Sequence, residues 1–261
     1  MTLNGNPNLR RVVKGSENGK YTTEDIAVAT MKGMAWKSVT LCAVTIIAAV
    51  LSAALLGYFI NTENETALFT LLMVLAFSAI PLIIISFVIM FVPKTASVLG
   101  FVYCALEGLV MGVISALFDM IYPGIAIMAF LGTCIVFVIS VLVFNVLGKK
   151  ISSKFVKFVL ISFISLILLE GIGYILSLFI DAFALVMGNI WVQLAISAVM
   201  ILWATFMILV DLNNMKLIAD NNTDKKYEWL AAFSLVTTLM WLYLEILELL
   251  AKIALLAKRE Q

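Results

Sequence analysis

One stretch decides the fold of this chain: residues 226–252, KYEWLAAFSLVTTLMWLYLEILELLAK. As an α-helix it is long enough to cross a bilayer, because about 20 apolar residues suffice. It nevertheless carries Glu245 and Glu248 well inside, and an ionised carboxylate in hydrocarbon costs from about 2.5 to above about 10 kcal/mol. We therefore expect this helix to lie in the middle of a bundle, with partners or water at its acidic side chains.

The composition of the whole chain indicates the same class. Of its 261 residues, 64% are hydrophobic and only 13% are charged, and the mean hydropathy is +1.13. No soluble domain of this length needs so much apolar surface, so the chain is predicted to be an all-α integral membrane protein. The apolar runs are continuous rather than alternating, which argues against a β-barrel. The net charge of +1 argues against a nucleic acid partner.

The sequence lacks histidine and several motifs on which many catalytic sites depend. There is no histidine, which removes His-ligated metal sites and nucleophile pairs that contain His. The motifs of intramembrane aspartyl and rhomboid proteases are also absent. Cys42, Cys104 and Cys134 each lie in a different apolar run and form no CxxC, so they are interpreted as small buried hydrophobic residues. We expect no enzyme activity, no catalytic residue and no cofactor.

The chain divides into a tail, a membrane domain and a second short tail. Residues 1–35 are predicted to be a polar tail with a short interfacial helix, which starts at a capping box formed by Thr22 and Asp25 and ends near Lys37. Residues 36–256 are predicted to form the seven-helix membrane domain, and residues 257–261 the C-terminal tail. The expected spans are 36–60, 67–92 (with a kink at Pro81), 96–118, 123–147, 155–180, 190–212 and 229–256.

The loops predict the orientation in the membrane. Loops 61–66, 119–122 and 181–189 contain no Lys or Arg, whereas the N-terminal tail and the alternate loops are basic. By the positive-inside rule this is a multi-pass protein of the plasma (inner) membrane with a cytoplasmic N-terminus. Seven spans place the C-terminus outside, although Lys258 and Arg259 favour the inside. A re-entrant last helix is the alternative.

Five acidic residues fall within or at the end of predicted spans. Glu248 precedes Lys252 by four residues, which predicts a structural ion pair on one helix. The other four have no basic neighbour on their own helix. Each of them alone could be a protonated carboxyl that donates a hydrogen bond to a neighbouring oxygen. Together they favour a polar path for a cation or protons, because four buried acids without a role are costly. These four are Glu107, Glu170, Asp211 and Glu245.

Several short motifs, in this order and spacing, resemble the Bax inhibitor-1/YccA-like family, in its bacterial branch, over nearly the whole chain. They are NPNLRR at 6–11, YCALEG at 103–108, YPGI at 122–125, DLNNMK at 211–216, YEW at 227–229 and WLYLEIL at 241–247. The resemblance implies a seven-helix bundle with the last helix central and a pH-sensitive calcium leak. It also implies that Asp211 and Glu245 form the acid pair, a calcium or proton site that controls the pore. Glu107 and Glu170 remain candidates for the polar path.

This chain departs from the family pattern in three places. Relatives have Asp where this chain has Glu245, and an arginine-rich turn where it has only Lys94. The segment between Asp211 and Glu245 is also longer. The function expected first is therefore a cation leak with calcium as the permeant ion and the lipid bilayer as its surroundings. The alternative is a non-enzymatic regulator whose partner is a membrane protease or the translocation machinery.

Overall fold

The computed structural model describes residues 28–147 and 151–259, and in these ranges every regular element is a helix. Seven helices are long and apolar enough to cross a membrane, which confirms the predicted all-α membrane fold. They are α2 (Met31–Asn61), α3 (Glu65–Phe91), α4 (Ala96–Ile121), α5 (Ile125–Leu147), α6 (Ser153–Ser177), α8 (Ile190–Asp220) and α9 (Tyr227–Arg259). A 3₁₀ turn, η2 (Pro93–Thr95), and a short helix, α7 (Asp181–Met187), lie in two of the connections.

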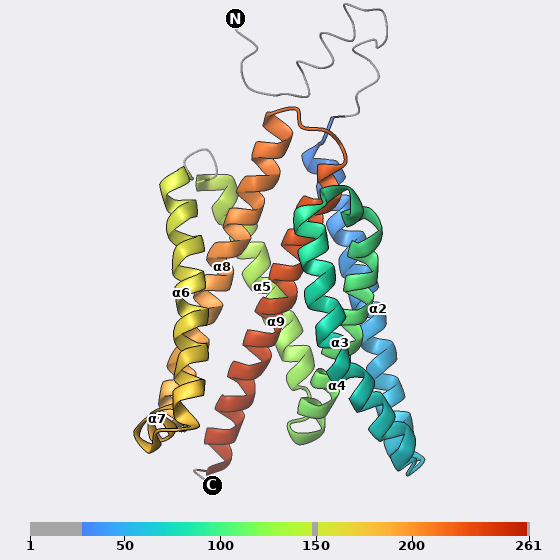
Figure 1. Ribbon diagram of the computed structural model, residues 1–261, viewed down its shortest axis with the longest axis vertical. Helices are drawn as coiled ribbons and strands as arrows, with labels where there is room; N and C mark the ends of the chain where they lie inside the picture. Colours follow the sequence, from blue (N-terminus) through green and yellow to red (C-terminus); the bar gives the residue numbers. More distant parts are fainter. Residues whose placement is uncertain (1–27, 148–150, 260–261) are drawn as a thin grey trace, which may run out of the picture.

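The last helix is the most buried span. In its most apolar window 56% of the residues are buried, against 28% or less in each of the other six spans. It packs against α2, α4, α5 and α8, and it runs obliquely between these helices in Figure 1. The helix α3 packs on α2 and α4, and α6 packs on α7 and α8. An arrangement of all six other spans around the last one stays a prediction.

Small residues bring α2 and α4 into close contact. A Cβ atom on Gly112 would collide with the Ala49 carbonyl and the Ser52 hydroxyl, and one on Gly108 would collide with the Thr45 carbonyl. Only glycine allows the two backbones to approach this closely, as is common between helices in membranes. The motif residue Glu107 is therefore carried by a helix that is held tightly against α2.

Two of the predicted helix boundaries are wrong. The helix expected to run from Thr22 to Lys37 is not continuous, because residues 28–30 are extended and α2 starts at Met31 with Thr30 as its N-cap. Long-range partners hold this segment extended: the Ala29 backbone N–H donates to the Thr223 carbonyl over 2.8 Å, and Val28 bridges to Asp224. Thr22 and Asp25 lie outside the described residues.

The second boundary concerns the connection between the last two spans. The helix α8 continues to Asp220 rather than ending at Leu212, so Asp211 lies inside the helix and not at its end. In addition, α9 is one continuous helix from Tyr227 to Arg259, which makes the re-entrant alternative wrong. The N-terminal end of α2 and the C-terminal end of α9 accordingly lie at opposite ends of the bundle (Figure 1).

Candidate functional site

Asp211 is a buried carboxylate at the contact between α8 and α9. Its residue is only 4% exposed. The Ser234 hydroxyl donates to Oδ1 over 2.7 Å and the Thr238 hydroxyl donates to Oδ2 over 2.6 Å. Ser234 and Thr238 are four residues apart, so they lie on the same face of α9. Within the described residues, Asp211 has no ion pair with a Lys or Arg side chain, and the two hydroxyl donors are what stabilise its charge.

The hydroxyl of Thr238 has a second acceptor within reach. Its Oγ1 lies 3.1 Å from the backbone carbonyl oxygen of Ser234, one turn earlier on α9. A hydroxyl has one proton to donate, so this proton is shared between the helix backbone and the Asp211 carboxylate. The contact between α8 and α9 at this point thus has two hydrogen-bond arrangements available.

Glu245 lies on a different part of α9. The Trp241 indole N–H donates to Glu245 Oε1 over 2.9 Å. Glu245 follows Thr238 by seven residues, which is about 10 Å along a helix axis. Glu245 therefore lies at a different turn of α9 from Ser234 and Thr238, which bind Asp211. Among the described residues, no hydrogen bond joins Asp211 and Glu245. That they act together at one calcium or proton site stays a prediction.

An acid of another span, on α6, also interacts with Glu245. Glu245 interacts electrostatically with Glu170 of α6, and with Glu248 and Lys252 of its own helix. The rings of Phe163 on α6 and Trp241 on α9 are in contact, with centroids 5.0 Å apart. Glu245 thus belongs to a second group of acids, toward the C-terminal end of α9.

Glu107 stands apart from both groups. It is partly buried on α4 and interacts electrostatically with Tyr103 and Cys104 of the same helix. Among the described residues, no group of three or more His, Cys, Asp or Glu side chains could hold a metal ion. The acids within the described part of the chain therefore lie at separate positions along the bundle.

The ion pair predicted from spacing is present. Lys252 Nζ lies 2.6 Å from Glu248 Oε1. The same ammonium group donates to Ser197 Oγ over 2.8 Å and to the Gln193 carbonyl over 3.4 Å. Because Ser197 and Gln193 belong to α8, Lys252 also ties the C-terminal part of α9 to the N-terminal part of α8.

A second ion pair, which is more deeply buried than the first, was not predicted from the sequence. Glu228, at the start of α9, is 1% exposed and accepts hydrogen bonds from Lys37 Nζ over 2.6 Å and from the Thr30 backbone N–H over 2.8 Å. Lys37 also lies over the Trp229 ring, 4.9 Å from its centroid. The partners are 191 residues apart. The one indication in the sequence is Gly33, because its missing side chain leaves the space that the Glu228 carboxyl occupies.

Comparison with known proteins identifies one match. The model of a protein family described as "Bax inhibitor 1 like" matches residues 6–255, which is nearly the whole chain. No curated protein matches the sequence, and no solved structure matches it.

Proposed function

Because this chain belongs to the Bax inhibitor 1 like family, we propose that it is a cation leak of the inner membrane in which Asp211 is the pH-sensitive element. Calcium is the proposed permeant ion. The observation that carries the proposal is the carboxylate of Asp211, which is 4% exposed and, within residues 28–147 and 151–259, accepts hydrogen bonds from two hydroxyl groups of the neighbouring span.

Protonation of Asp211 would change how α8 and α9 are joined. As a carboxylate, Asp211 accepts from both Ser234 and Thr238. As a neutral acid it gains a donor of its own and needs one hydrogen bond fewer from α9. The Thr238 hydroxyl could then donate fully to the Ser234 carbonyl, which is 3.1 Å away. Protonation would also remove the negative charge that strengthens both hydrogen bonds between the helices, which loosens their contact.

The ligand chemistry supports a passing cation rather than a resident one. Calcium prefers six to eight oxygen ligands, and carboxylate and hydroxyl oxygens are what the proposed path offers. The described residues contain no cluster of three acids that would hold the ion firmly. Conduction requires binding that is weak enough for the ion to leave. Glu245 and Glu170 are proposed as a second position on the same path, separate from Asp211.

The direct test is calcium flux into vesicles that contain only the purified protein. We expect flux above that of protein-free vesicles, and a changed flux in Asp211→Asn. Ser234→Ala combined with Thr238→Val keeps the carboxylate but removes its donors, and should also alter the flux. Ser165→Ala is the matched control, since that hydroxyl is exposed and donates to a carbonyl of its own helix. A folded protein without flux would overturn the leak and favour a regulator that needs a partner.

The proposed orientation has its own test. The alternation of loops with and without Lys or Arg supports a cytoplasmic N-terminus. A reporter fused after Lys150 should then be cytoplasmic, and one fused after Glu63 should lie on the other side. Both reporters on one side would contradict the orientation without bearing on flux.

A further inference from the structure

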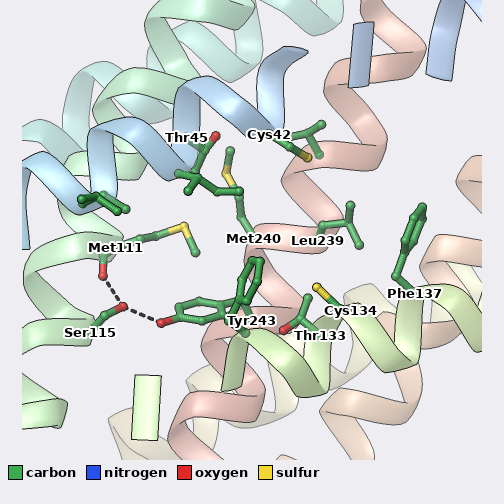
Figure 2. A pocket seen from close by; sticks show the side chains of 15 residues that line it. Cys42, Thr45, Met111, Ser115, Thr133, Cys134, Phe137, Leu239, Met240 and Tyr243 are labelled. Carbon is green, nitrogen blue, oxygen red and sulfur yellow. Dashed lines mark hydrogen bonds between the residues drawn. The ribbon is translucent and has the colours of Figure 1, made fainter. Parts of the chain in front are cut away.

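A pocket of about 350 Å³ lies between four spans, α2, α4, α5 and α9. Its volume is within the range of about 300–1,000 Å³ that is usual for ligand sites. Figure 2 shows Cys42 of α2 and Cys134 of α5 on opposite sides of the pocket, and Tyr243 of α9 extending toward Ser115 of α4. No charged residue lines it. None of the buried carboxylates described above belongs to this pocket, so it is a different site from the proposed cation path.

The pocket opens sideways from the bundle. Its rim on α2 is formed by Ile46 and Val50, whose exposed fractions are 46% and 63%. Its rim on α5 is formed by Phe130 and Cys134, which are also exposed. The helices α2 and α5 share no extensive contact, whereas both pack against α9. The gap between α2 and α5 is therefore a window, and α4 and α9 form the wall behind it.

The window lies at mid-membrane depth. Its rim residues on α2 fall near the middle of that 31-residue span. A helix rises about 1.5 Å per residue, so about 20 Å of helix separates Ile46 from either end of α2. What surrounds the window is thus the hydrocarbon of the bilayer, not water or headgroups.

The hydroxyl groups in the pocket wall already have hydrogen-bond partners within the protein. The Tyr243 and Ser115 hydroxyl oxygens are 2.7 Å apart, and the Ser115 hydroxyl donates to the Met111 carbonyl over 2.6 Å. Because the Ser115 proton is used in that bond, Tyr243 is the donor to Ser115; Figure 2 draws both hydrogen bonds as dashed lines. Thr45 and Thr133 each donate to a carbonyl of their own helix. Water needs two to four polar partners, so this pocket suits hydrocarbon instead.

We infer that the pocket binds one acyl chain of a bilayer phospholipid, which enters through the window between α2 and α5. The depth of the window indicates the ligand, because acyl chains are the molecules present in the middle of the bilayer. The pocket wall also suits an acyl chain, because the wall is apolar and its hydroxyl groups already have hydrogen-bond partners. The bound chain would contact α2, α5 and α9 together, while its headgroup stays in the headgroup layer of the bilayer.

The test is photo-crosslinking in vesicles made with phosphatidylcholine that carries a diazirine in the middle of one acyl chain. Met111 and Met240 are 6% and 5% exposed and lie on the back wall. A lipid that only surrounds the protein cannot reach them. We expect mass spectrometry of the unaltered protein to find crosslinks at both residues, in addition to those on exposed positions.

A blocking variant gives the second measurement. Cys134→Trp places a large ring in the window, and we expect it to abolish the crosslinks at Met111 and Met240. Ile135→Trp is the matched control, because Ile135 is 59% exposed on the same helix and does not line the pocket. Crosslinks on exposed positions alone in the unaltered protein would overturn the inference, whether or not Cys134→Trp folds. Crosslinks at the two methionines that survive in a folded Cys134→Trp would also overturn it. The readout is independent of ion flux.

Discussion

The buried ion pair between α2 and α9 supports the sharpest prediction about stability. Glu228→Gln keeps the size of the side chain and an oxygen that can accept from Thr30, but it leaves the Lys37 ammonium without its counter-charge. Breaking a buried pair in this way costs about 3–5 kcal/mol. We expect the lower end, about 3 kcal/mol, because the Lys37 side chain is 17% exposed and retains the Trp229 ring.

The assay is thermal unfolding of the purified protein in detergent. A loss of about 3 kcal/mol corresponds to a fall of about 6–12 °C in Tm, at about 2–4 °C per kcal/mol for a chain of this size. Combining Glu228→Gln with Lys37→Met removes both charges, so most of the loss should be recovered. Glu65→Gln, at an exposed acid, is the control. Equal Tm values for the single and double variants would refute this reasoning.

Two further predictions concern packing and charge. Glu248→Gln alone should lower Tm more than Glu248→Gln with Lys252→Met, because the single variant leaves the 14%-exposed Lys252 charge without its acid. A larger fall in the double variant would contradict this and show that the other hydrogen bonds of Lys252 contribute more. Gly112→Ala should destabilise by about 1–3 kcal/mol through overpacking against α2. Gly57→Ala, where a Cβ meets nothing within 4 Å, should be neutral or slightly stabilising, and equal effects of the two alanines would contradict the close contact.

Much of the fold is predictable because its cause is local. Seven apolar runs specify seven spans, since a backbone in hydrocarbon must satisfy its hydrogen bonds within each helix. The pair of Glu248 and Lys252 follows from helix periodicity alone. Gly108 and Gly112 likewise indicate a close helix contact before the partner helix is known.

What the sequence could not provide are contacts between distant segments. The partners of Asp211 are Ser234 and Thr238. Asp211 lies inside α8 because this helix continues to Asp220, although the polar residues after Leu212 had predicted the end of the span. The motifs suggested Glu245 as the partner instead, because they indicate residue types and order but not which turns of α8 and α9 face each other. For the same reason, the sequence did not predict the ion pair of Lys37 and Glu228.

The central claim is that the proton on Asp211 controls cation flux. The measurement that tests it most directly is the pH profile of calcium flux across neutral pH, in vesicles that contain either the unaltered protein or Asp211→Asn. The account predicts a pH-dependent flux in the unaltered protein and a flat profile in Asp211→Asn, while Glu245→Gln, about 10 Å from Thr238 along α9, changes the size of the flux but keeps its pH dependence. A pH profile in Asp211→Asn that has the same shape as that of the unaltered protein would contradict the account.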